Sequence, residues 1–166
     1  MLPSLDIQGW QELDAAFRKA PDIVREELLA AVTEADQLLE REVKDLTPTA
    51  SGVSRASIFS REQVLGEAGI GVVGTSQPHV MYVELGTRPH MPPVEALEDW
   101  VRVKLGISDE KKIHGIAYLV ARKIAVRGTL GVGMFHRTWA RQRDAVVRRF
   151  DLARHRIVAR IAAAAS

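Results

Sequence analysis

The stretch from Met81 to Pro93 constrains the fold more than any other part of the chain. Gly86 tolerates a positive φ angle that other residues rarely adopt, so the chain can turn sharply at this position. Three prolines follow within seven residues, and each fixes its own φ angle and disfavours helix in the residue before it. The stretch therefore predicts a turn followed by extended chain, with sheet before it and helix after it.

Apolar residues at helical spacing predict two helices in the N-terminal part of the chain. Trp10 and Phe17 share one face of the first helix, which we expect to end at Pro21 because proline lacks the backbone N–H of the helical ladder. A single apolar stripe over 22–46 then predicts a long second helix, with acidic residues near the positive end of its dipole.

The segment between about 57 and 85 predicts a small, mainly antiparallel sheet. Residues 57–60 and 64–65 look like short strands. Residues 69–74 have the spacing G-x-G-x-x-G, but such glycines hold a dinucleotide only in a strand-to-helix turn. The Thr-Ser-Gln-Pro sequence that follows should not open a helix, so we predict a Gly-rich strand and no cofactor loop.

Two further helices are predicted after the prolines. Apolar residues at helical spacing occupy 94–105 and end at Gly106, a common C-terminal glycine. Asp109 is a suitable N-cap for a second helix that ends at Arg127 beside another glycine. The simplest arrangement for 93–128 is an antiparallel helical hairpin.

A long last helix is predicted from about Met134, after a loop expected to be flexible because of Gly128, Gly131 and Gly133. Its apolar side is expected to consist of Phe135, Trp139, Val146, Phe150, Ala153, Ile157 and Ile161. The fold class predicted for 1–166 is therefore α+β, a single domain. Its long N-terminal and C-terminal helices are expected to pack on one face of the small antiparallel sheet.

Charge is distributed unevenly along the chain. Residues 1–50 contain 11 Asp/Glu against 5 Lys/Arg, net −6, whereas residues 133–166 contain 8 Arg against 2 Asp, net +6. Such asymmetry is typical of nucleic-acid binding, of a partner surface, or of two ends that attract each other between copies, but two solvated helix faces would also produce it. The residues that could face a partner or DNA are Arg137, Arg141, Arg148, Arg156 and Arg160.

The sequence gives little support for catalysis. There are no cysteines, and the five histidines are scattered without metal-ligand spacing. Ser51 and Ser57 have no obvious base, and Glu84 beside Tyr82 more often orders backbone amides or a partner's arginine than acts as an acid. We therefore expect no enzyme, no metal and no cofactor.

Compartment signals are also absent from the sequence. The N-terminus lacks the basic start and apolar run of a signal peptide, and no apolar stretch approaches the ~20 residues of a membrane span. The lack of cysteine fits synthesis in a reducing cytoplasm. We expect a protein that is neither secreted by a signal peptide nor embedded in a membrane.

The order of these features resembles the minor tail component family of long-tailed bacteriophages, also described as tail completion or head-tail joining proteins. The most specific match is 82–87, where the family shows an aromatic residue, an apolar residue, Glu, an apolar or aromatic residue and Gly-Thr. A looser match lies in the spacing of Pro48, Gly52 and Ser57, and residues 5–10 give a third. Together the matching features cover most of the chain. The assembly residues that the resemblance implies are Pro48, Gly52, Ser57, Tyr82, Glu84, Gly86 and Thr87.

The sequence departs from the family pattern after the Gly-Thr turn. The family passes soon to a Pro-Phe segment that begins the last helix, whereas here some forty residues with two predicted helices intervene. Gly133-Met134-Phe135 stands where that segment belongs. The resemblance therefore implies that 93–128 is an inserted helical hairpin.

The function implied by the resemblance is structural. The resemblance implies a virion protein that is made in the host cytoplasm and lies at the neck or tail end of the particle. There it would form a homo-oligomeric ring that serves as a connector. Its implied partners are neighbouring neck and tail proteins such as a tail terminator, tail tube or head-completion protein, with non-specific contact to DNA in the channel and no small-molecule substrate or membrane. The alternative is a small nucleic-acid-binding regulator that uses the Arg-rich C-terminal helix, although no helix-turn-helix signature is found.

Overall fold

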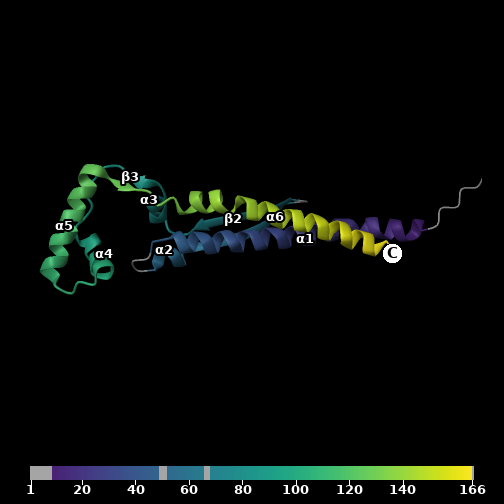
Figure 1. Cartoon of the computed structure of the whole chain (residues 1–166), viewed down its shortest axis with the longest axis horizontal. Helices are drawn as coiled ribbons and strands as arrows, with labels where there is room; N and C mark the ends of the chain where they lie inside the picture. The colour runs from purple at the N-terminus through teal and green to yellow at the C-terminus, as the bar shows by residue number, and fades with distance from the viewer. Residues whose placement is uncertain (1–8, 49–51, 66–67, 166) are drawn as a thin grey trace, which may run out of the picture. The chain divides into compact units, whose positions relative to one another are not determined.

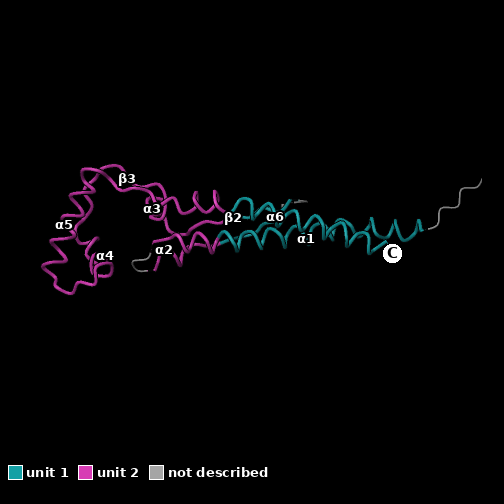
Figure 2. The backbone as a smooth tube through the Cα atoms, viewed as in Figure 1, with its two compact units in different colours: residues 1–39, 60–72, 142–166 teal, residues 40–59, 73–141 magenta. Residues whose placement is uncertain are grey.

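The computed structural model describes residues 9–48, 52–65 and 68–165 and confirms an α+β fold with long N-terminal and C-terminal helices (Figure 1). The chain divides into two compact units (Figure 2). Unit 1 comprises Met1–Leu39, Ser60–Val72 and Gln142–Ser166, and unit 2 comprises Glu40–Phe59 and Val73–Arg141. The longest helices and the longest strands each contribute residues to both units.

The N-terminal helix α1 runs unbroken over Trp10–Leu46, 37 residues with Pro21 inside it. The prediction of two helices separated at Pro21 is therefore wrong. Proline has a helical φ angle, but it lacks the N–H of its helical bond and its ring crowds the carbonyl four residues earlier, at a cost of about 3 kcal/mol relative to alanine. Ala16 and Ile23, on either side of Pro21, are both buried, and this packing offsets the cost and keeps the helix continuous.

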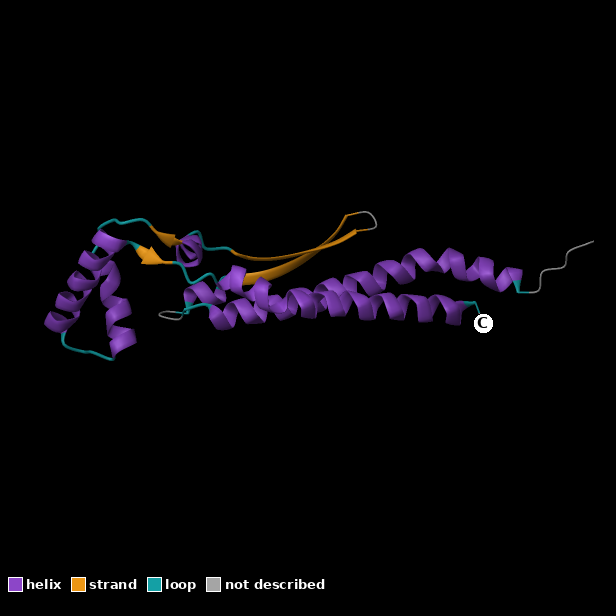
Figure 3. Ribbon diagram, turned by 45° about the horizontal axis from the view of Figure 1, so that its top comes forward, coloured by secondary structure: helices purple, strands orange, loops and turns teal. Residues whose placement is uncertain are grey.

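Strands β1 (Ile58–Leu65) and β2 (Ala68–Thr75) form a two-stranded sheet (Figure 3). Only two residues connect them, so the pair is an antiparallel hairpin, and the two short strands predicted near 57–65 are one strand. In unit 1, a Cβ placed on Gly69 would lie 3.0 Å from Val32 Cγ2, and one on Gly71 would lie 2.6 Å from Asp36 Cγ. The Gly-rich segment is thus a strand, as predicted, and its glycines let the strand backbone lie directly on α1.

The segment after β2 differs most from the sequence prediction. His79–Leu85 forms a helix, α3, where the predicted sheet should have continued. Another short helix, α2 (Val53–Ala56), lies before β1. Pro78 directly precedes α3, a position where proline is compatible with helix, so the expectation that no helix opens here is wrong. Val80 is fully buried in the unit 2 core, and this burial outweighs the strand preference of the residues that follow it.

A second small sheet joins two segments far apart in the chain. Strand β3 (Gly86–Thr87) pairs antiparallel with β4 (Thr129–Leu130), with Gly86 opposite Leu130 and Thr87 opposite Thr129. The Gly-rich segment before the last helix, predicted as a flexible loop, therefore contains a strand. Sequence spacing alone gave no sign of this pairing.

The helical hairpin is confirmed as an element of the fold. Helix α4 (Glu95–Leu105) is followed by its C-cap Gly106, which has the left-handed conformation. Asp109 is the N-cap of α5 (Glu110–Arg127), and its side chain accepts hydrogen bonds from the backbone amides of Lys111 and Lys112. The two helices pack around a core of their own, formed by Val101, Ile113 and Ala117 with Val94, Leu97, Ile107 and Ile116.

The last helix, α6, spans Met134–Ala164, as predicted from Met134 onward. Its predicted apolar side is only partly correct, because Trp139 is 54% exposed whereas Met134 and Thr138 are buried. Met134 belongs to the main core of unit 2, which consists of Val43, Ile58, Val80 and Met134 with Leu46, Val73, Val83, Val132 and Phe135 around them.

Candidate interaction site

The 82–87 motif lies against the segment that leads into α6. The carbonyl oxygen of Val83 accepts a hydrogen bond from Val132 N at 2.8 Å, and that of Glu84 accepts one from Gly133 N at 3.1 Å. Beyond them, the hydroxyl of Thr87 accepts from the backbone N–H of Thr129 at 3.2 Å. Residues 82–87 and 129–136 thus form one joint in unit 2, which we call the motif joint.

The Glu84 carboxylate caps the N-terminus of α6. Its Oε2 accepts a hydrogen bond from Phe135 N at 3.0 Å, and its Oε1 accepts one from His136 N at 3.1 Å. The first amides of a helix have no partner inside the helix, and a negative charge is favourable at this end of the helix dipole. Of the two roles expected for Glu84, ordering backbone amides or a partner's arginine, the structure shows the first, and the amides belong to α6.

Glycines make the motif joint possible. Gly86 has φ 78°, and a Cβ on it would lie 2.7 Å from Gly131 N and would overlap Thr129 O. A Cβ on Gly131 would lie 2.6 Å from the carbonyl carbon of Leu85. The two backbones touch directly, so glycine is required here both for its conformation and for its lack of a side chain.

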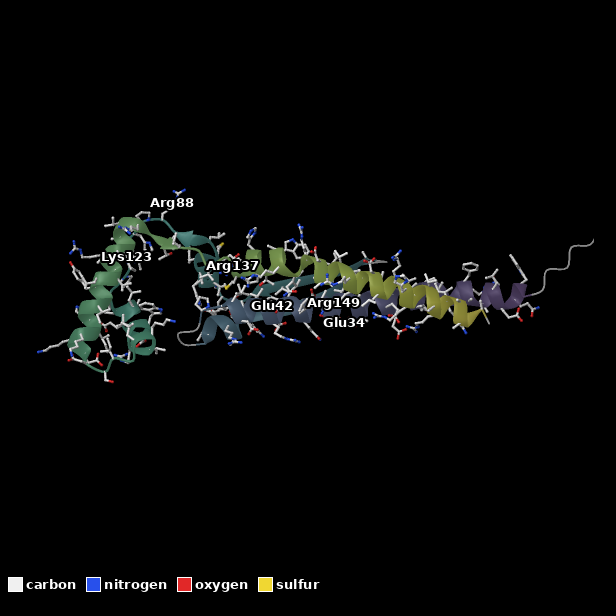
Figure 4. The ribbon with its side chains drawn as sticks, in the orientation of Figure 1. Glu34, Glu42, Arg88, Lys123, Arg137 and Arg149 are labelled. Carbon is white, nitrogen blue, oxygen red and sulfur yellow. The ribbon has the colours of Figure 1, made fainter. Side chains whose placement is uncertain are left out.

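A large groove in unit 2 opens beside the motif joint, with a volume of about 930 Å³. Its wall is mainly apolar and is contributed by α3, α4, α5 and the β3–β4 pair. Tyr82 is 60% exposed on it and Leu130 is 97% exposed. Lys123, labelled in Figure 4, and Arg127 add positive charge. Tyr82, the aromatic residue of the 82–87 motif, therefore lies on a surface and not in the core.

The remaining motif residues lie around α2. Pro48 is exposed after the end of α1, and Gly52 is the N-cap of α2 with φ 79°. The hydroxyl of Ser57 donates to Ser54 O at 2.7 Å and lies 2.7 Å from the Thr75 hydroxyl, which ties α2 to the end of β2. In the part of the chain that the structure describes, no hydrogen bond joins these residues to 82–87.

Two of the five predicted partner-facing arginines form ion pairs inside unit 1. Arg156 Nε lies 2.6 Å from Glu27 Oε2, and Arg160 reaches both Glu27 at 2.8 Å and Glu26 at 2.7 Å. The hydrogen bonds from Arg156 and then Arg160 lower the pKa of Glu27. The hydrogen bonds that Arg160 donates, first to Glu27 and then to Glu26, raise the pKa of Arg160. The acidic and basic ends of the sequence therefore attract each other within one chain.

The other three arginines extend from α6 without such partners. Arg137 donates only to the backbone oxygen of Val132, at 3.4 Å. Arg141 and Arg148 form no hydrogen bond or ion pair with any residue that the structure describes. Their guanidinium groups remain available to an external anion.

Within the described ranges, no group of three or more His, Asp or Glu side chains is placed to hold a metal ion. Among the described helices, none is long and apolar enough to cross a bilayer.

Comparisons of the chain with protein-family models, with curated proteins and with solved structures found no match.

Proposed function

We propose that this chain is a structural virion protein of a tailed phage that forms part of the neck or tail end as a homo-oligomeric ring. The observation that carries the proposal is the motif joint. Both oxygens of Glu84 hold backbone amides, and Gly86 sits where no side chain fits, so the motif serves to fix the chain in shape. A motif with this use suits an assembly protein better than an enzyme.

Exposed apolar side chains support an assembly role. Trp10, Phe17, Tyr82, Trp139 and Leu130 are each more than half exposed. Soluble monomers rarely expose large apolar patches, and aromatic residues are enriched where proteins contact one another. A chain that meets further copies of itself and neighbouring tail or head-completion proteins would cover such side chains.

The test is to delete the gene from the phage that carries it and to examine the lysate by electron microscopy. The proposal predicts DNA-filled heads and separate tails, and restoration of joined particles when the intact protein is supplied from a plasmid. Supplying the Gly86→Ala variant, which should misassemble at the motif joint, is the matched control for protein expression. Normal infectious particles from the deletion would refute the proposal.

A second candidate function, binding to nucleic acid, is supported by the two arginines of α6 without partners. If Arg141 and Arg148 each neutralise one phosphate, a plot of the logarithm of duplex affinity against the logarithm of salt concentration should have a slope of about −1.8. The double variant Arg141→Gln/Arg148→Gln should abolish that dependence. Binding that also discriminates between sequences would favour the regulator over a channel protein.

A further inference from the structure

The first five residues of β2, 68–72, form an open strand edge in unit 1. In a sheet of two strands each strand is paired along one edge only, and alternate residues direct their backbone N–H and C=O groups away from the partner strand (Figure 3). Each residue of 68–72 is exposed. None of them forms a backbone hydrogen bond outside its own sheet with a residue that the structure describes. This edge can therefore accept a further strand.

The edge lacks the features that usually prevent such pairing. Natural edge strands are commonly protected by charged side chains, by proline or by an element that covers them. The segment 68–72 contains no charged residue and no proline, whereas β1 contains Arg61 and Glu62. A strand added to an open edge gains main-chain hydrogen bonds, and its side chains determine which strand is accepted.

The two faces of this segment have different side chains. Gly69 and Gly71 face α1, because a Cβ on either would lie within 3.0 Å of a side-chain atom of that helix. Side chains alternate along a strand, so Ala68, Ile70 and Val72 face away from α1. Ile70 is 42% exposed and Val72 is 52% exposed. One face therefore offers only glycine, and the other offers only apolar side chains.

The segment has the same pattern when it is read in either direction from Ile70. In an antiparallel pair centred on Ile70, this residue lies opposite its own counterpart, Gly69 lies opposite Gly71, and Ala68 lies opposite Val72. Glycine meets glycine on the side of α1, apolar side chains meet on the other side, and no like charges are opposed. A second copy of this chain therefore matches the edge through its own sequence.

We infer that β2 pairs antiparallel with β2 of a second copy across a two-fold axis at Ile70. The contact is isologous, because the same surface is used by both copies, and it joins the two hairpins into one sheet of four strands. The inference goes beyond the proposed function and does not rest on it. A ring is built from heterologous contacts, whereas this contact joins two chains or one chain from each of two rings.

The test uses the full-length variants Ile70→Lys and Ile70→Glu. Ile70 is exposed, so both variants should fold, which circular dichroism checks. Each variant alone places two like charges opposite each other and should associate at least about tenfold more weakly than the parent in sedimentation velocity. An equal mixture places lysine opposite glutamate and should associate at least about tenfold more tightly than either variant alone.

The recovery on mixing is specific to this register, because a residue meets its own counterpart only at a two-fold axis. The matched control is the pair Val158→Lys and Val158→Glu on α6, also in unit 1, where the side chain is 64% exposed. These variants should associate like the parent, alone and mixed.

A cysteine variant tests the same contact without a charge. The chain contains no cysteine, so Ile70→Cys gives each copy one thiol. Opposed residues of an antiparallel pair have Cβ atoms about 4.5–5.5 Å apart, which a small adjustment brings within reach of a disulfide. Air oxidation should convert most of Ile70→Cys into a product of two chains, and Val158→Cys should stay mainly single.

Several results would overturn the pairing. They are a parent that is monomeric at every concentration, single Ile70 variants that associate like the parent, and a mixture that gains nothing. Open-ended aggregation of the parent, relieved by Ile70→Lys, would show an unspecific edge instead of a defined pair. If the charged variants unfold, the yield of the Ile70→Cys product decides. None of these results affects the gene deletion, which tests the role in the virion separately.

Discussion

Replacing Gly86 by alanine should destabilise the protein far more than the same change at Gly106. Both glycines have positive φ angles, 78° and 64°, so alanine meets similar backbone strain of about 1–2 kcal/mol at either site. They differ in their surroundings. A Cβ on Gly106 meets nothing within 4 Å, whereas one on Gly86 lies 2.7 Å from Gly131 N and overlaps Thr129 O.

The difference between the two variants therefore measures the close approach at the motif joint. Backbone atoms cannot move aside like a flexible side chain, so overpacking should cost Gly86→Ala about 1–3 kcal/mol beyond the strain. For a chain of this size that is a further fall in melting temperature of about 2–12 °C. Thermal unfolding followed by circular dichroism measures both variants side by side. Equal losses at the two sites would show that the β3 and β4 backbones do not touch as described.

Three further predictions concern single side chains. Glu84→Gln should stay folded but lower the free energy of unfolding by about 1 kcal/mol, because the amide nitrogen of glutamine cannot accept a hydrogen bond from a helical N–H. Hydrogen exchange at the Phe135 and His136 amides should accelerate, and unchanged exchange would contradict the cap. The pKa of Glu27 is lowered in the folded protein, so the stabilisation by its ion pairs is complete above about pH 4.5 and is lost as the pH falls through the folded-state pKa. Between about pH 6 and pH 3 the parent should therefore lose more free energy of unfolding than Glu27→Gln, and equal losses would contradict the ion pairs. Pro21→Ala should raise stability by up to about 3 kcal/mol in urea unfolding, and a loss would show that α1 needs its proline.

Local signals made part of the fold predictable. Gly106 ends α4 and Asp109 begins α5 for reasons contained in a few neighbouring residues, and both were identified in the sequence. The Gly-rich strand at 69–74 was also predicted, although the helix α3 that opens after it was not. Helix caps and periodicity act over three or four positions, which is the range over which a single sequence is informative.

The motif joint was not predictable because its partners are distant in sequence. Thr87 and Thr129 are 42 positions apart, and Glu84 caps a helix 51 positions further on. The ion pair between Glu27 and Arg156 spans 129 positions. Glu84 was correctly marked as a residue that orders amides, but nothing in the sequence shows which amides tertiary packing brings to it. The positive charge of α6 was likewise evident, whereas the pairing of Arg156 and Arg160 with the acidic residues of α1 was not.

The pairing of these two arginines changes what can hold two copies together. Glu26 and Glu27 are already engaged by Arg156 and Arg160, so these acidic and basic groups are not free to attract each other between copies. A ring held by charge would weaken strongly between about 0.1 M and 1 M salt, where the screening length falls from about 10 Å to about 3 Å. A ring held by burial of exposed apolar side chains such as Trp10 and Phe17 should persist, because burial of apolar surface does not depend on the screening length. Sedimentation at both salt concentrations distinguishes the two, and dissociation of the assembly at 1 M would show that charge, and not apolar burial, joins the subunits.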